Sequence, residues 1–165
     1  MTGSEYSTLP QGDVRLLDDP IAQRLLNSDA LARLAWVAGD GTPRLIPMGY
    51  TWNGAAVVMT TVVPSAKLAS LRDRPEVAIT IDTAGPPPDV LLLRGPVEIT
   101  EVGGVPDEYG QMQRKYYSAE QAEANVALLK GAGVRMALLV VRPTWVSTLD
   151  FQTRVPAAML NAVNG

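Results

Sequence analysis

The chain has 165 residues, of which 47% are hydrophobic and 19% are charged, and its formal net charge is −3. These values predict one globular domain, residues 1–165, and the negative charge argues against the basic surface of a nucleic-acid-binding protein. The sequence contains no cysteine and no histidine, which excludes disulfides, thiolate nucleophiles, cysteine-based metal sites and the Ser-His-Asp arrangement. If the protein is an enzyme, we therefore expect a cofactor to carry the chemistry.

The N-terminal segment, residues 1–13, is polar and is predicted to form a loose arm without the apolar core of a signal peptide. No apolar run approaches about 18 residues, so no membrane-spanning helix is expected and a cytoplasmic protein is predicted. Asp19 and Pro20 then have the pattern of a helix cap and first helical position, and this helix is predicted to end near residues 27–28.

Segments of alternating apolar and polar residues, separated by turn residues, predict five β-strands between residues 31 and 101. They cover residues 31–38, 43–50, 55–60, 76–82 and 90–101. Tight turns join the first three, so these are expected to form a meander. Pro47 cannot donate to a sheet ladder, which places the second strand at an edge or beside a ligand. The pair Gly95-Pro96 predicts that the fifth strand is interrupted at a bulge or at the corner of a barrel.

A helical insert is predicted next, over residues 106–131, with its second helix opened by a capping box at Ser118. Residues 134–142 and 144–149 form the last predicted strands, and the tail beyond residue 150 is expected to be irregular. About seven strands with short helices between them indicate a mainly β or α+β domain, an antiparallel barrel with helices packed outside.

The segment around Ser65 has the pattern of an anion site. A strand ends at Thr60 and Thr61, and Ser65 is placed to cap a helix over residues 65–72 with Lys67 in its first turn. Backbone amides in a first helical turn have no intrahelical partner, so they suit a phosphate, and Lys67 adds a full positive charge beside them. The same pattern also fits an ordinary capped surface helix with solvated basic residues.

Four segments in a particular order and spacing, residues 35–44, 52–54, 65–75 and 93–97, resemble the pyridoxamine 5'-phosphate oxidase-like split β-barrel superfamily. This superfamily includes flavin- and deazaflavin (F420)-dependent oxidoreductases, and the resemblance extends over residues 18–149. It implies a split antiparallel β-barrel with short peripheral helices. It also implies a homodimer with two cofactor sites at the subunit interface.

The resemblance also implies which residues hold the cofactor. The ring would lie on Leu45, Ile46, Pro47 and Met48, its pyrimidine edge and ribityl chain near Thr60 and Thr61, and the phosphate on Ser65, Ala66 and Lys67, with Arg72 as a second phosphate or tail contact and with Arg94 and Trp145 near the interface. Each of the last two has an ordinary structural role as its alternative, a solvated or paired charge for Arg94 and a core side chain for Trp145.

The resemblance does not extend to the residues that catalyse pyridoxamine phosphate oxidation, so that activity is not expected here. True oxidases of that kind use a histidine and an arginine near the C-terminus, whereas this chain has no histidine and residues 151–156 do not match. The expected function is therefore hydride transfer between bound FMN and a small organic substrate. The first alternative is an F420-dependent reductase, because a basic groove formed by Arg44, Arg72, Arg74 and Arg94 would suit the acidic tail of F420.

The second alternative is a protein that binds flavin, F420 or haem without turnover, although haem lacks its usual axial histidine here. A folded dimer with a decayed cofactor site is the third. No catalytic residue and no metal ligand are assigned. Tyr109, Tyr116 and Tyr117 on the insert are candidate proton donors, with packing as the expected role of most of them.

Overall fold

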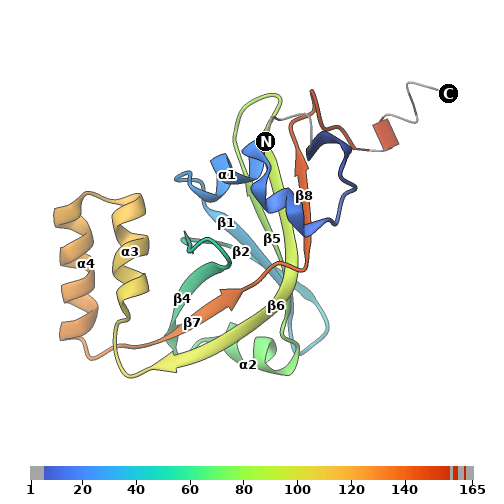
Figure 1. Ribbon diagram of the computed structural model, residues 1–165. Coiled ribbons are helices and arrows are strands. Elements are labelled where there is room, and N and C mark those ends of the chain that lie inside the picture. The colour runs from blue at the N-terminus through green and yellow to red at the C-terminus, as the bar shows by residue number, and fades with distance from the viewer. Residues whose placement is uncertain (1–5, 157, 160–161, 163–165) are drawn as a thin grey trace.

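The computed structural model describes residues 6–156, 158–159 and 162, and within them the strands curl into an antiparallel half-barrel with short helices outside it (Figure 1). The strands are β1 Ala32–Val37, β2 Pro43–Met48, β3 Thr51–Trp52, β4 Val57–Val63, β5 Glu76–Asp82, β6 Val90–Val102, β7 Arg135–Val141 and β8 Trp145–Leu149. The helices are η1 Tyr6–Thr8 and η2 Val14–Asp18, both 3-10, and α1 Pro20–Leu26, α2 Ala66–Asp73, α3 Asp107–Tyr116 and α4 Ala119–Gly131.

The sheet runs in the order β2-β1-β5-β6-β7-β4-β3, and β8 pairs with β6 beside this path. Every ladder is antiparallel, which confirms the predicted fold class. The strand that contains Pro47, β2, lies at the edge of the sheet, as the missing amide predicts. The concave face is filled by apolar side chains from the central strands, among them Leu34, Met59, Ile79, Ile81, Leu91, Leu93 and Leu139.

The longest strand, β6, turns the corner of the half-barrel. It pairs with β5 up to Pro96 and with β8 up to Arg94, and it pairs with β7 from Val97 onward. The prediction of an interrupted strand is wrong, because β6 is continuous over 13 residues. The predicted corner at Gly95 is confirmed, and the reason for glycine is steric: a Cβ there would lie 2.6 Å from the backbone oxygen of Arg142.

The predicted three-strand meander is also wrong. The β1–β2 hairpin forms, but β4 pairs with β3 and β7 instead of β2. The chain leaves the β1 ladder at Gly49 and Tyr50, where the Tyr50 ring turns into the core. Its hydroxyl donates a 2.6 Å hydrogen bond to the carbonyl oxygen of Leu25, which satisfies the buried phenol.

Residues 6–13 do not form the predicted loose arm. The Tyr6 side chain belongs to the core, and the amide of Gly12 donates a 2.8 Å hydrogen bond to the carbonyl oxygen of Val146. The guanidinium of Arg154 also donates to the carbonyl oxygens of Tyr6 and Leu9. The remainder of the predicted arm, residues 1–5, lies outside the described residues.

The predicted helix caps are largely confirmed. The Asp19 carboxylate accepts a 2.8 Å hydrogen bond from the amide of Ile21 at the start of α1, and the Ser118 hydroxyl accepts one of 3.2 Å from Gln121 at the start of α4. The α3–α4 hairpin stands to one side of the barrel, with α3 against β3 and β4 and α4 against α3 (Figure 1). No helix in the described part of the chain is long and apolar enough to cross a membrane.

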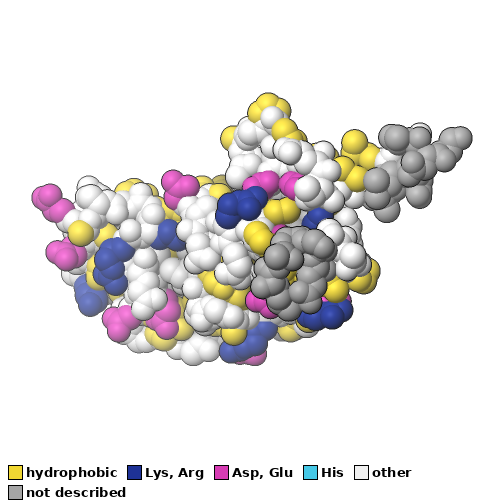
Figure 2. Space-filling view, turned by 45° about the horizontal axis from the view of Figure 1, so that its top comes forward, with side chains coloured by type: hydrophobic (Ala, Val, Ile, Leu, Met, Phe, Trp, Pro, Cys, Tyr) yellow, Lys and Arg dark blue, Asp and Glu magenta, His cyan; other side chains and the backbone are white. Residues whose placement is uncertain are grey.

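The surface charges are mixed on the face in Figure 2, where basic and acidic side chains are interspersed. Arginines that the sequence offers as a basic groove are engaged with acidic neighbours: Arg44 pairs with Asp40 at 3.0 Å, and Arg74 lies 3.6 Å from Asp73. Ion pairs of this exposed kind contribute little to stability, about 0–1 kcal/mol each.

Candidate functional site

The side chains of Thr61, Ser65 and Lys67 form one polar cluster where β4 leads into α2; we name it the Lys67 cluster. The ammonium group of Lys67 donates to the Thr61 hydroxyl at 2.8 Å and to the Ser65 hydroxyl at 3.1 Å. A lysine ammonium has three N–H groups, so one donor remains for a ligand. The side chain is half-buried, and this burial lowers the pKa of Lys67.

The start of α2 presents backbone amides beside this ammonium group. Ser65 occupies the N-cap position, but its side chain makes no capping hydrogen bond, so the predicted cap is wrong. The Ser65 hydroxyl accepts from Lys67, and its backbone oxygen accepts from Leu68 at 3.0 Å. The amides of Ala66 and Lys67, in the first turn, have no intrahelical partner. Two amides, the helix dipole and a lysine thus converge, which is an arrangement suited to an anion.

The two predicted threonines divide between the faces of β4, because successive residues of a strand point to opposite sides. Thr61 is buried and joins the Lys67 cluster. Thr60 points to the other face, where its hydroxyl is buried without a hydrogen-bond partner among the described residues. The structure therefore brings Thr61, and not Thr60, to Lys67.

The predicted phosphate or tail contact Arg72 lies in the last turn of α2 and pairs with Glu101 on β6. The same carboxylate accepts a 2.7 Å hydrogen bond from Arg135 on β7. Arg72 is thus committed to a surface ion-pair network and is not part of the Lys67 cluster. A cofactor tail would have to compete with Glu101 for this guanidinium.

Arg94 and Trp145 face each other across the β6–β8 ladder. The guanidinium carbon of Arg94 lies 4.0 Å from the centroid of the Trp145 ring, a cation–π contact. Arg94 is exposed and Trp145 is half-buried, so the pair forms a flat stack at the surface. The structure therefore brings these two predicted residues together.

The predicted ring residues form the outer strand β2. Leu45 is 63% exposed and Pro47 is also exposed, while Ile46 and Met48 are half-buried. Gly49, which follows β2, lines a cavity of about 440 Å³ between the barrel and α3. The walls of this cavity are Leu31, Gly49, Met112, Gln113, Tyr116 and Tyr117. A Cβ on Gly49 would lie 2.3 Å from the sulfur of Met112, so glycine permits α3 to pack this closely.

Most of the predicted site residues therefore lie in three groups, which are the Lys67 cluster, the edge strand β2 and the Arg94–Trp145 stack. Thr60 and Arg72 lie outside all three. Among residues 6–156, the side-chain hydrogen bonds and ring contacts of these groups do not link one group to another. Within one copy of the chain, the residues predicted to hold the phosphate lie together except for Arg72, but those predicted for the ring and the interface are not joined to them.

Lys115 on α3 is a notable residue that the sequence reasoning missed. Its nitrogen lies 3.3 Å from the centroid of the Tyr50 ring and is buried without a hydrogen-bond partner among the described residues. Burial lowers the pKa of Lys115 to about 8, although the charge of Asp29 acts in the opposite direction. Lys115 follows Met112 by three residues, a spacing that places both on the same side of a helix. No pattern in the sequence shows that the ammonium group has no hydrogen-bond partner among the described residues.

The candidate proton donor Tyr116 has a packing role. Its hydroxyl donates to the carbonyl oxygen of Ala30 and accepts from the amide of Tyr50, both at 3.3 Å. Its neighbour Tyr117 is exposed, and Tyr109 is half-buried, with its pKa raised by burial and by the nearby Tyr117. The hydroxyl of Tyr116 therefore joins α3 to the chain on both sides of the β1–β2 hairpin.

Replacing Lys115 with methionine should raise the unfolding free energy by about 1 kcal/mol at about pH 7, because an unpaired buried ammonium costs more than its cation–π contact returns. In the natural chain, between a pH of about 8 and the ordinary lysine pKa of 10.5, the unfolded state binds more protons at this position than the folded state. Stability should therefore rise with pH across this interval, and the rise should be smaller in the variant, which keeps the lowered pKa of Lys67 but not that of Lys115.

Urea unfolding at about pH 7 and about pH 9.5 measures both effects. The matched control is Lys130→Met, at an exposed position near the end of α4. It should keep the pH dependence of the natural chain. Equal pH dependence in the Lys115 variant and the natural chain would show that this ammonium is solvated.

Comparison with known proteins gives a family match and a group of similar folds. Residues 19–150 match the family model described as pyridoxamine 5'-phosphate oxidase. No curated protein matches the chain. Among solved structures, an F420 reductase is 26% identical, with a TM-score of 0.60 over 76% of this chain and 94% of that chain.

Two further structures are similar in fold alone. A conserved hypothetical protein from Mycobacterium tuberculosis is 16% identical, with a TM-score of 0.64 over 90% of this chain and 91% of that chain. The heme storage protein from Vibrio cholerae is 13% identical, with a TM-score of 0.58 over 78% of this chain and 92% of that chain. Proteins with this fold thus differ in activity, so the function must be inferred from the residues of the site.

Proposed function

Because the chain belongs to the pyridoxamine 5'-phosphate oxidase family, we propose that it is an oxidoreductase that holds a flavin or deazaflavin by its phosphate at the Lys67 cluster. The observation that carries this proposal is the convergence of the Lys67 ammonium with the uncapped first amides of α2. This donor set suits a phosphate and needs neither histidine nor cysteine. When bound, the cofactor would accept or donate the hydride, while the chain binds, orients and shields it.

The ring of the cofactor is proposed to lie along the edge strand β2, on the apolar row of residues 45–48. The cavity of about 440 Å³ next to Gly49 supports this placement, because it would open beside the ring and accept a small organic substrate. Its walls are mainly apolar and aromatic. Thr60 and Arg72 remain proposed contacts, and Arg72 would have to leave Glu101 to serve as one.

A homodimer is proposed to complete the site. The exposed side chains of Val37 and Leu45 lie on the β1–β2 hairpin, where a second copy could bury them. The partner would then bring its own Arg94–Trp145 stack to the cofactor. This arrangement would explain why one copy does not join the three groups of predicted residues.

F420 is the proposed cofactor and FMN is the alternative. The sequence pattern favours FMN for the wider superfamily, but the 26% identity with an F420 reductase over most of both chains favours F420 here. Haem is a weaker candidate, because the chain has no histidine to serve as the usual axial ligand.

Separate fluorescence titrations of the cofactor-free protein with F420 and with FMN test the proposal. We expect F420 to bind at least about tenfold more tightly than FMN, a difference of about 1.4 kcal/mol. Tighter FMN binding would assign the protein to the flavoenzymes. Binding of neither would overturn the phosphate site, and tight binding of a cofactor that no donor reduces would indicate a binding protein instead of an enzyme.

A further inference from the structure

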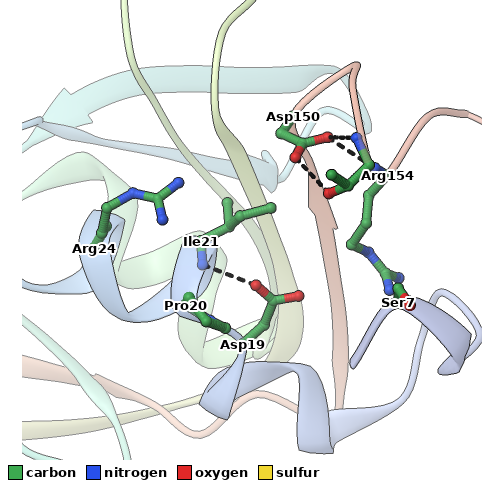
Figure 3. A pocket seen from close by; sticks show the side chains of 8 residues that line it. Ser7, Asp19, Pro20, Ile21, Arg24, Asp150 and Arg154 are labelled. Carbon is green, nitrogen blue, oxygen red and sulfur yellow. Dashed lines mark hydrogen bonds between the residues drawn. The ribbon is translucent and has the colours of Figure 1, made fainter. Parts of the chain in front are cut away.

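A second cavity, of about 410 Å³, lies between the N-terminal segment, α1 and the turn after β8 (Figure 3). Its volume falls within the range of small-molecule sites, about 300–1,000 Å³. It is lined by Ser7, Asp19, Pro20, Ile21, Arg24, Asp150, Thr153 and Arg154. None of the residues predicted to hold the cofactor lines it, so it is separate from the proposed oxidoreductase site.

Two of the lining residues are buried ions of opposite charge. Asp19 is 4% exposed and Arg154 is 8% exposed. Charged side chains buried to this extent are normally paired with an opposite charge. Neither residue forms an ion pair in the part of the chain that the structure describes.

The partners of these two ions are neutral groups. The Asp19 carboxylate accepts from the amide of Ile21 at 2.8 Å and from the hydroxyl of Thr148 at 3.1 Å. Among the described residues, the Arg154 guanidinium donates only to backbone oxygens, including that of Thr148 at 3.1 Å. Because both ions contact Thr148, a negative and a positive charge flank the same residue at the wall of one cavity.

Both ions retain hydrogen-bonding capacity for a ligand. Arginine has five N–H donors, and the three hydrogen bonds that Arg154 donates within the described part of the chain leave two of them. Each oxygen of the Asp19 carboxylate accepts one hydrogen bond from a described residue and can accept a second. A ligand with one charge would leave the other ion unneutralised, whereas a molecule with both charges matches the pair.

The rim of the cavity has a second pair of charges. In Figure 3, Arg24 lies across the cavity from Arg154, and Asp150 lies across from Asp19. Arg24 pairs with Asp89 through one nitrogen at 2.6 Å, and its other donors remain. Burial acts to raise the pKa of Asp150, but hydrogen bonds from the Thr153 hydroxyl and from nearby amides outweigh it and bring that pKa to about 2.

We propose that this cavity binds a free α-amino acid, whose ammonium group donates to Asp19 and whose carboxylate accepts from Arg154. The two charges of an α-amino acid are one carbon apart, which suits two ions on either side of Thr148. Arg24 and Asp150 add one further charge of each sign at the rim. Pro20 and Ile21 supply the apolar wall for a side chain of moderate size.

Isothermal titration of the full chain with L-leucine and two matched analogues tests the proposal. N-acetyl-L-leucine lacks the positive charge, and L-leucinamide lacks the negative charge. L-leucine should bind at least tenfold more tightly than either analogue. No binding of L-leucine, or equal binding of a singly charged analogue, would overturn the proposal.

A charge-neutral variant identifies the site. Asparagine caps helices about as well as aspartate, so Asp19→Asn should retain the start of α1 while removing the charge. Affinity for L-leucine should fall at least tenfold, and affinity for N-acetyl-L-leucine should not change. The control is Asp40→Asn, the same substitution in the distant β1–β2 turn, which should leave L-leucine binding unchanged.

The outcomes are separable from those of the proposed oxidoreductase function, because cofactor titration of Asp19→Asn should match that of the natural chain. If Asp19→Asn does not fold, the comparison of the three ligands with the natural chain still decides the proposal. An Asp19 variant that binds L-leucine with unchanged affinity would overturn it.

Discussion

Lys67→Met should weaken cofactor binding by about 1.5–3 kcal/mol, roughly 10- to 150-fold in the dissociation constant, because it removes a hydrogen bond to a charged phosphate. The methionine keeps the apolar stem of the side chain. The hydroxyls of Thr61 and Ser65 lose only the donor that they share. Fluorescence titration with F420 or FMN measures the effect, and urea unfolding should show a much smaller loss of stability.

The matched control for this variant is again Lys130→Met, which removes a lysine from the exposed end of α4, outside the proposed site. Its dissociation constant should equal that of the natural chain, which separates a local contact from a general effect of net charge. An unchanged dissociation constant in Lys67→Met would exclude Lys67 from the phosphate site.

Gly95→Ala should lower the unfolding free energy by about 3 kcal/mol, at the upper end of the usual cost of overpacking. The added Cβ would lie 2.6 Å from the backbone oxygen of Arg142 and 3.2 Å from the backbone nitrogen of Thr144. These are main-chain atoms, so no side-chain rotation relieves the clash. The amide of Thr144 also donates to the carbonyl oxygen of Arg94 at 2.9 Å, and moving this segment would strain that bond.

Equilibrium unfolding in urea tests this prediction. Gly103→Ala is the matched control, because a Cβ there would meet nothing within 4 Å. The control should change the unfolding free energy by no more than about 0.5 kcal/mol. If both variants have the stability of the natural chain, the connection between β7 and β8 can move away from β6, and the account of the barrel corner is wrong.

Local signals predict the elements of this fold better than their pairing. Asp19 before Pro20 and Ser118 before α4 predict helix starts, because capping involves residues two or three positions apart. The loss of the meander depends on Tyr50, whose hydroxyl reaches an oxygen 25 residues earlier. The docking of residues 6–13 depends on Arg154, which contacts Tyr6 across 148 residues. No pattern of neighbouring residues contains these distant contacts.

The candidate site shows the same division. The closeness of Thr61, Ser65 and Lys67 follows from their spacing in the sequence, and the structure brings them together. The capping role of Ser65 was predicted wrongly because Lys67 takes its hydroxyl as an acceptor. The cavity beside Asp19 could not be predicted, because its walls come from both ends of the described chain.

The position of the cofactor phosphate tests the central claim most directly, and a crystal structure of the protein with bound F420 or FMN would measure it. We expect phosphate oxygens within hydrogen-bond distance of the Lys67 ammonium and of the amides of Ala66 and Lys67, with the ring along β2. A phosphate bound elsewhere, with Lys67 still donating only to Thr61 and Ser65, would contradict the proposed site.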